Sequence, residues 1–166
     1  MSNRLVSLPE IADLPPHVRR HLLDQIQRHD LEAFVHRAFC VVTPGQDYAH
    51  NWHISAIAHK LDKVRRGEIK RLIIAMPSRY LKSLCVSIAF PAFLLGHDPS
   101  LRIIAASYAE SLAVAISNDF RRLVQSKDYK RLFPKTYIDP AKNTEREVRT
   151  TKGGFRLATS GGGALT

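Results

Sequence analysis

The chain has 166 residues, of which 45% are hydrophobic and 24% are charged, a composition typical of one globular domain with a buried core. Its 25 lysines and arginines outnumber 15 acidic residues and give a formal net charge of +10, which favours polyanionic partners such as nucleic acid, a nucleotide or an anionic membrane surface. Two cysteines, Cys40 and Cys85, lie in apolar stretches; this argues against a disulfide framework or a zinc site and predicts two small buried hydrophobic residues.

The sequence shows no signal for export or membrane insertion. Its first residues, MSNRLVSLPE, lack the hydrophobic segment of a signal peptide. The longest apolar run, Leu84–Leu95, contains Pro91 and is shorter than the roughly 20 residues needed to span a bilayer. We therefore expect a soluble protein of the reducing cytoplasm, without a membrane partner.

Three helices are predicted before the first strand. The first opens at Pro15-Pro16 and has an apolar residue every four positions: Val18, Leu22 and Ile26. Asp30 is the predicted N-cap of the second, whose apolar face holds Leu31, Phe34, Val35 and Ala38. The third follows a turn at Pro44-Gly45, runs from about Asn51 to Arg66 and ends at Gly67. Its predicted inward residues are Ile54, Ile57, Ala58, Leu61 and Val64.

The next segments predict an alternation of strands and helices. Leu72–Met76 is a continuous apolar run typical of a buried strand. The helix after Lys82 is predicted to reach Leu95, with a kink at Pro91 and Gly96 closing it. Arg102–Ala106 is a second predicted buried strand. Strand and helix in succession indicate a parallel α/β sheet.

The second strand leads into a further predicted helix. Ser107 can cap that helix, and Glu110 would complete a capping box. Ser107-Tyr108 would also lie at the carboxyl edge of the sheet, where open α/β sheets bind ligands. The chain from Lys127 to Pro140 is predicted to be irregular. Glu147–Thr151 and Phe155–Thr159 then predict a hairpin joined at Lys152-Gly153-Gly154.

The stretch Met76–Ser83, MPSRYLKS, is the strongest functional motif. A Lys-Ser pair at the start of a helix fed by a buried strand is how a P-loop holds phosphate: amides face the anion, Lys82 adds charge and Ser83 can reach Mg²⁺. The usual glycines are missing, and Leu81 occupies the position of the glycine before the lysine. The alternative is a solvated turn with unpaired basic residues; the two apolar flanks and Arg79 favour the phosphate site.

Several segments, in the same order, resemble the ATPase half of a bacteriophage or prophage terminase large subunit. They are NWHISAIAHKLDKVRRGEIKRLIIAMPSRYLKS, SIAFPAFLLGHDPSLRIIAASYAESLA, DFRRLVQSKDYKRLF and TTKGGFRLATSGGGALT. That family has a variant Walker A of the type PxRxxKS, and one branch carries leucine at the position of Leu81. The resemblance implies an incomplete P-loop NTPase-type α/β fold, a parallel sheet flanked by helices. Residues 1–50 would form an N-terminal helical lead-in and residues 51–166 a partial P-loop ATPase domain.

The resemblance also implies individual roles in binding ATP and Mg²⁺. Lys82 would neutralise the β- and γ-phosphates, Ser83 would bind Mg²⁺ and Arg79 would stabilise charge on the γ-phosphate. Trp52 and His53 match a segment near the adenine; a core aromatic, and a core or surface histidine, are the alternatives. Arg79 and Lys82 are the implied catalytic residues. The implied nucleotide-binding residues are Trp52, His53, Ser78, Arg79, Tyr80, Leu81, Lys82 and Ser83.

By the same resemblance, the partners are double-stranded DNA, a terminase small subunit and a portal protein, with a homo-oligomeric ring possible in the full-length family. Two basic clusters could contact DNA phosphates: Lys63, Arg65, Arg66, Lys70 and Arg71, and Arg121, Arg122, Lys127, Lys130 and Arg131. The family's paired Walker B acids and its nuclease domain would lie beyond Thr166. We therefore expect a truncated terminase piece that binds phosphate and hydrolyses ATP poorly, and the residues leave open whether it is an enzyme.

Two other functions remain open. The net charge of +10 and the presence of Leu81 are equally compatible with a basic DNA-binding remnant without ATPase activity. A helicase-type P-loop ATPase fragment would share the strand, loop and helix.

Overall fold

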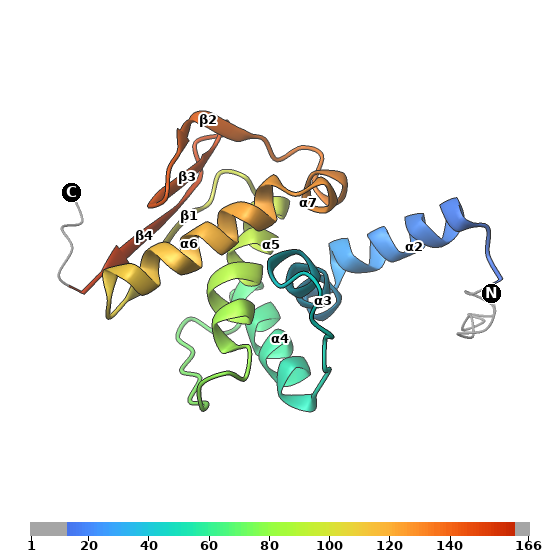
Figure 1. Cartoon of the computed structure of the whole chain (residues 1–166), viewed down its shortest axis with the longest axis horizontal. Helices are drawn as coiled ribbons and strands as arrows, with labels where there is room; N and C mark the ends of the chain where they lie inside the picture. The colour runs from blue at the N-terminus through green and yellow to red at the C-terminus, as the bar shows by residue number, and fades with distance from the viewer. Residues whose placement is uncertain (1–12, 162–166) are drawn as a thin grey trace.

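A computed structural model describes residues 13–161 as a mixed α/β structure (Figure 1). The helices are α2 (Pro16–His29), α3 (Leu31–Val42), α4 (Trp52–Arg65), the π-helix η1 (Leu84–Ala89), α5 (Phe90–His97), α6 (Glu110–Gln125) and α7 (Lys127–Leu132). The strands are β1 (Arg102–Ser107), β2 (Ile138–Asn143), β3 (Glu147–Thr150) and β4 (Phe155–Ser160).

The first two predicted helices are confirmed, and Asp30 separates them. Its backbone is extended, so α2 ends there, and its carboxylate accepts a hydrogen bond of 2.7 Å from the Ala33 amide at the start of α3. The apolar residues of α2 do not enter the core, because Val18 and Ile26 are 39% and 42% exposed. Gln27 is the buried residue of α2.

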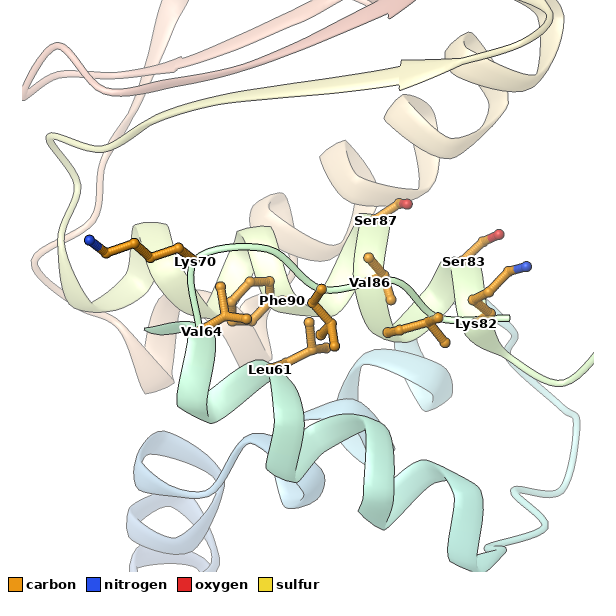
Figure 2. A pocket seen from close by; sticks show the side chains of 10 residues that line it. Leu61, Val64, Lys70, Lys82, Ser83, Val86, Ser87 and Phe90 are labelled. Carbon is orange, nitrogen blue, oxygen red and sulfur yellow. The ribbon is translucent and has the colours of Figure 1, made fainter. Parts of the chain in front are cut away.

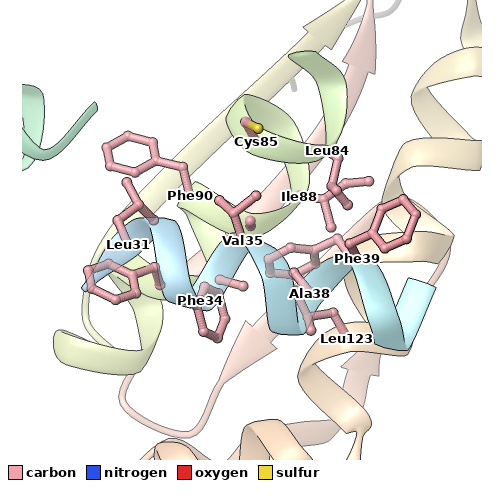
Figure 3. Packing of buried hydrophobic residues seen from close by; sticks show 14 of the residues in the cluster. Leu31, Phe34, Val35, Ala38, Phe39, Leu84, Cys85, Ile88, Phe90 and Leu123 are labelled. Atoms are coloured by element: carbon pink, nitrogen blue, oxygen red, sulfur yellow. The ribbon is translucent and has the colours of Figure 1, made fainter. Parts of the chain in front are cut away.

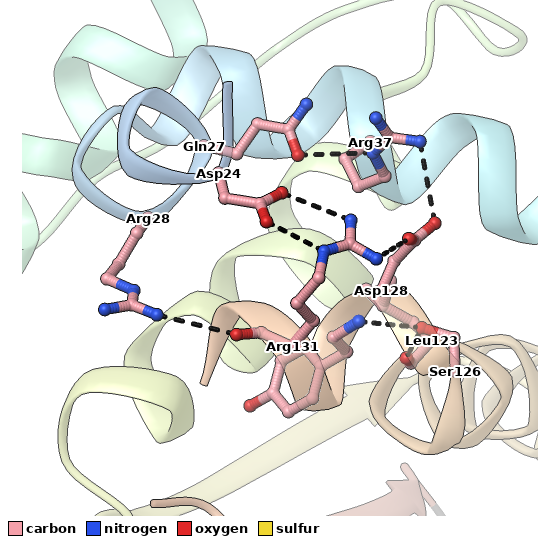
Figure 4. A network of polar contacts seen from close by, with 9 residues as sticks. Asp24, Gln27, Arg28, Arg37, Leu123, Ser126, Asp128 and Arg131 are labelled. Carbon is pink, nitrogen blue, oxygen red and sulfur yellow. Dashed lines mark hydrogen bonds and ion pairs between the residues drawn. The ribbon is translucent and has the colours of Figure 1, made fainter. Parts of the chain in front are cut away.

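Helix α2 is instead held by polar contacts with α3 and α7 (Figure 4). Arg131 of α7 binds both carboxylate oxygens of Asp24, at 2.8 and 3.2 Å, and also pairs with Asp128. Arg37 of α3 pairs with Asp128 and donates to Gln27. An arginine fork on a carboxylate is directional, so this network fixes how α2 lies on the rest of the chain.

The hydrophobic core is centred on α3 and on η1 with α5 (Figure 3). Phe34 and Val35 of α3 are fully buried. The Phe34 ring lies 5.5 Å from Phe93, 6.3 Å from Tyr129 and 5.6 Å from Phe133, separations at which aromatic rings attract each other. Helix α4 adds its predicted inward residues Ile54, Ile57, Ala58 and Leu61 to the same core, while Val64 is partly buried.

The sheet is mixed, which corrects the prediction of a parallel sheet. Its strand order is β1-β4-β3-β2, and only β1 and β4 are parallel among these pairs. The predicted hairpin is confirmed as β3 and β4, and it returns β4 beside β1. One face of the sheet packs on α6, while Ile104 on the other face of β1 is 57% exposed. The segment predicted to be irregular forms α7 and then β2.

The predicted strand at Leu72–Met76 is wrong. The segment alternates in exposure, with Leu72, Ile74 and Met76 packed against the core and Ile73 94% exposed. It pairs with none of the strands that the structure describes. Apolar side chains are enough to lay the segment on the helices, but a strand also needs a backbone partner, and none lies beside it. The edge of β1 that faces away from β4 likewise pairs with no strand between residues 13 and 161.

Three smaller predictions are also wrong. Ser107 ends β1 and Ala109 is the N-cap position of α6, so the capping box does not form; Glu110 pairs with Arg146 instead. Gly96 lies inside α5, where a Cβ would come within 2.6 Å of the Phe133 ring, so it serves packing and not helix termination. Cys40 is exposed, whereas Cys85 is buried, and burial raises the pKa of its thiol to about 11.

Helices long and apolar enough to cross a bilayer are absent between residues 13 and 161.

Candidate functional site: the loop before η1

The loop from Met76 to Ser83 connects the extended segment to the helix, as the sequence predicts. Arg79 and Leu81 have positive φ values of 70° and 58°, and they are the non-glycine residues with positive φ in the described chain. Tyr80 between them does not. A leucine in this left-handed region is strained by its Cβ, so the loop takes up a conformation that glycine would favour. Alternating φ signs turn successive backbone amides toward one side, an arrangement that suits anions.

The predicted phosphate-binding residues gather at one cavity of about 660 Å³. Its loop wall consists of Ser78, Arg79, Leu81, Lys82 and Ser83. Most of the remaining lining is apolar and comes from α3, η1 and α6: Phe39, Val42, Leu84, Ile88, Leu112 and Ile116. A cavity of this size with a few polar groups on one side is typical of small-molecule sites.

Lys82 and Ser83 form the first helical turn after the loop. The Lys82 ammonium donates back to the Met76 carbonyl at 3.4 Å, a long hydrogen bond that spans the base of the loop. Because this contact is weak, the ammonium can exchange it for an anion at little cost. Both residues therefore sit where an incoming phosphate would meet a cation and a hydroxyl.

The same two side chains also border a second cavity of about 400 Å³ (Figure 2). It lies over η1 and α5, with Leu72 and Ile74 of the extended segment on one side and Val86, Ser87 and Phe90 on its floor. Lys70 is also in its lining. Lys82 and Ser83 thus separate an apolar groove from the loop cavity.

Trp52 and His53 do not line the loop cavity. The alternative of a core aromatic is wrong for Trp52, which is 77% exposed. His53 contacts Tyr80 of the loop edge to face, with ring centroids 5.6 Å apart, and Trp52 contacts His53 at 6.2 Å. The start of α4 therefore reaches the loop through Tyr80, on the outer side of the cavity.

Two residues outside the Met76–Ser83 motif also line the loop cavity: Tyr108, just after β1, and Asp119 of α6. Tyr108 is 89% exposed. Burial raises the pKa of Asp119, although Arg122 at 3.5 Å opposes this. Arg122 also donates to the Val42 carbonyl at 2.9 Å. The spacing of Asp119 and Arg122 in the sequence predicts only a pair on one helix face, so no local signal places them opposite the loop.

The predicted basic clusters differ in how far they are neutralised. Arg65 and Arg66 both pair with Asp62, and Arg66 pairs also with Glu68. Arg122 and Arg131 are paired with Asp119 and Asp24, as described above. By contrast, no ion pair to an acidic side chain of the described chain is formed by the other members of the clusters, Lys63, Lys70, Arg71, Arg121, Lys127 and Lys130, or by Lys60, which lies outside them on α4.

Nowhere between residues 13 and 161 do three or more His, Cys, Asp or Glu side chains come together as a metal site.

Comparison with protein families, with curated protein sequences and with solved structures finds no match for this chain.

Proposed function

We propose that the loop at residues 76–83 binds the phosphates of a nucleotide. The observation that carries this proposal is the conformation of Arg79 and Leu81, at φ values of 70° and 58°. Non-glycine residues held in the left-handed region cost about 1–3 kcal/mol each and cluster at ligand-binding sites. One of the two, Leu81, occupies the position of the P-loop glycine directly before Lys82 and Ser83.

Each side chain has a separate task in this proposal. The amides of Tyr80 to Ser83 and the helix start bind the phosphate oxygens. Lys82 exchanges the Met76 carbonyl for the terminal phosphates, and Arg79 adds a second positive charge. Mg²⁺, bound between the phosphates and the Ser83 hydroxyl, would neutralise further negative charge. Tyr108 offers an aromatic face for the base at the other side of the cavity.

At the level of the whole protein, we propose a nucleotide-binding portion of a viral DNA-packaging ATPase of the terminase large-subunit kind. A cationic loop, an α/β arrangement and the ordered segment resemblance support it. Asp119 is the carboxylate in the lining of the loop cavity, and it is already paired with Arg122. We therefore expect nucleotide binding to be much stronger than hydrolysis.

Calorimetric titration with Mg²⁺ and a non-hydrolysable ATP analogue tests the loop. Lys82→Ala should weaken binding by about 10-fold or more, because a hydrogen bond to a charged group contributes about 1.5–3 kcal/mol. Lys60→Ala, at an exposed position of α4, is the matched control and should bind like the wild type. Equal binding by wild type and Lys82→Ala would exclude the loop as the phosphate site.

A second proposed function, binding to double-stranded DNA, is favoured by the lysines that lack acidic partners. Lys60, Lys63 and Lys70 lie on α4 or just after it. The nearby Arg65 and Arg66, by contrast, form ion pairs with acidic side chains. Counterion release from DNA predicts that the logarithm of the association constant falls linearly with the logarithm of salt concentration. Fluorescence anisotropy with duplex DNA should show this slope, and the Lys60→Ala, Lys63→Ala double variant should reduce it by about 2. A flat salt response would exclude this function.

A further inference from the structure

The helix that follows the loop is wider than an α-helix over its first part. Helical backbone begins at Lys82 and continues to His97, but Leu84–Ala89 forms a π-helix. The Phe90 amide accordingly bonds to the Cys85 carbonyl, five residues before it. Such widened turns are rare and need a local cause.

Pro91 supplies that cause. In an α-helix, residue 91 would donate its amide hydrogen to the Ser87 carbonyl, but proline has no such hydrogen and its ring would collide with that carbonyl. Pro91 therefore cannot supply the α-helical donor to the Ser87 carbonyl, and a widened turn accommodates a residue that has no amide hydrogen. The Ser87 carbonyl instead accepts a hydrogen bond from Nη2 of Arg156, at 3.2 Å.

Arg156 reaches this carbonyl from β4, at the other side of the core. Its side chain is 1% exposed, and its guanidinium lies 4.9 Å from the centre of the Phe120 ring. Two of its nitrogens, Nε and Nη1, have no hydrogen-bond partner. Burial lowers the pKa of Arg156 to about 10. Burying an incompletely paired cation costs free energy of folding. The hydrogen bond to the Ser87 carbonyl offsets part of this cost and suggests a specific role for Arg156.

We propose that Arg156 is a positioning residue for the phosphate loop, because it supplies the donor that Pro91 cannot give. The bond to Ser87 joins β4 to the wide helix one turn after Lys82 and Ser83. It thereby restricts how the start of the helix can shift along its axis or rotate about it relative to the sheet. This inference rests on the proposed phosphate-binding function of the loop.

Binding of Mg²⁺ and the non-hydrolysable ATP analogue to Arg156→Met tests the inference. We expect affinity to fall about 10-fold, the value of one hydrogen bond to a charged group. Arg156→Lys keeps a donor that can reach Ser87 and should recover most of the affinity. Arg149→Met is the matched control, because Arg149 also lies over an aromatic ring, Phe155, at 5.8 Å, but has no contact with η1; it should bind like the wild type.

A double variant distinguishes positioning from a general loss of structure. Pro91→Ala restores the amide hydrogen and removes the ring, so the turn can return to α-helical bonding, in which residue 91 donates to the Ser87 carbonyl. Arg156→Met added to Pro91→Ala should then change affinity less than two-fold, an interaction that a double-mutant cycle measures. An equal loss from Arg156→Met in both backgrounds would overturn the inference, as would wild-type affinity of Arg156→Met alone.

Hydrogen exchange gives a readout that needs no nucleotide. In Arg156→Met, the amides of residues 84–90 and of Ala92 should exchange faster than in Arg149→Met, and Pro91→Ala should reverse the change. If the wild type fails to bind nucleotide while this pattern appears, the proposed function fails but the role of Arg156 in holding the helix stands. Unchanged exchange in Arg156→Met would overturn the role of Arg156, whatever the nucleotide result.

Discussion

At Leu81, the sequence and the structure both indicate a backbone position that favours glycine. The sequence shows a leucine where a glycine is expected, and the structure gives that leucine a φ of 58°. The backbone has kept the glycine-like conformation even though the side chain opposes it. Its neighbours explain how this is possible, because Leu81 also packs against the hydrophobic core and so recovers part of the strain energy.

The effect of a Leu81 substitution on the free energy of unfolding should therefore depend more on the backbone preference of the new residue than on its size. We expect Leu81→Val to lower the free energy of unfolding by about 1–2 kcal/mol, because a β-branched residue is disfavoured at positive φ. Leu81→Gly relieves the strain but loses packing, and its stability should stay within about 1 kcal/mol of the wild type. Urea denaturation measures both, with Leu72→Val in the extended segment as the control. A larger loss of stability for Leu81→Gly than for Leu81→Val would contradict the proposed backbone strain at Leu81.

Gly154 is required for a different reason, a close approach of two backbone segments. A Cβ there would lie 2.3 Å from the Pro99 carbonyl oxygen and 2.5 Å from that of Leu101. Gly154 itself donates to the Pro99 carbonyl at 3.2 Å. Turn chemistry predicts a glycine at this hairpin, but only the fold shows that the chain before β1 runs directly over it.

Gly154→Ala should consequently be more damaging than Gly153→Ala. We expect the former to lower the free energy of unfolding by about 2–3 kcal/mol, because rigid backbone cannot move away from the added methyl. At Gly153 the surrounding space is open and φ is 83°, so alanine should cost only about 1 kcal/mol. Thermal or urea denaturation of the two variants compares them directly. Equal losses would show that the backbone before β1 can move aside.

At the scale of elements, two backbone segments have an edge that pairs with no strand of the described chain. One edge belongs to β1 and the other to the extended segment at Leu72–Met76, with the apolar groove beside the latter (Figure 2). Ile73 and Ile104 add exposed apolar side chains of 94% and 57%. Unpaired edges with exposed apolar residues promote pairing between chains.

We therefore expect the protein to associate as its concentration rises, and Ile73→Lys to reduce that association. A lysine on the exposed side of an unpaired edge opposes edge pairing through its charge and its solvation. Sedimentation velocity over a range of concentrations measures the effect. Leu23→Lys, at a 42% exposed position of α2, adds the same charge away from either edge and should not change association. Similar effects of the two variants would indicate a role of net charge alone.

The elements show which sequence signals were sufficient. The helices α3 and α4 and the β3–β4 hairpin were predicted because capping, apolar periodicity and turn residues act locally. The strand at Leu72–Met76 was not formed, since an apolar run specifies burial while a strand needs a partner. The α7 and β2 elements were missed because short elements gain their stability from packing: Tyr129 and Leu132 of α7 are buried in the core.

At the scale of the whole molecule, two histidines make stability depend on pH. His97 lies between Phe93 and Phe133, with ring centroids 4.6 and 5.4 Å away. Burial lowers the pKa of His97, partly opposed by its hydrogen bond with the Arg28 carbonyl and assisted by nearby cations. Burial, together with Arg37 and His50, lowers the pKa of His36 in the same direction.

Both shifts predict that the protein loses stability as the pH falls below 6.5, the ordinary pKa of histidine. The unfolded chain takes up these protons at a higher pH than the folded chain, so acidification favours unfolding. Urea denaturation at about pH 7.5 and about pH 5.5 should show the loss, and His97→Gln should reduce it. His59→Gln, on the exposed face of α4, is the control. A stability that rises on acidification over this range would contradict the lowered pKa values of His36 and His97.

The sequence by itself determined the local features of this protein: the capped helices, the hairpin, the basic surplus and the loop with Arg79, Lys82 and Ser83. These follow from propensities and charges that act within a few residues. Only the tertiary structure decided that the sheet is mixed, that Leu72–Met76 lacks a strand partner among the described residues, and that Asp119 lines the loop cavity. It alone joined Ser87, beside Pro91, to Arg156, because the guanidinium of a β4 residue reaches the Ser87 carbonyl only in the folded chain.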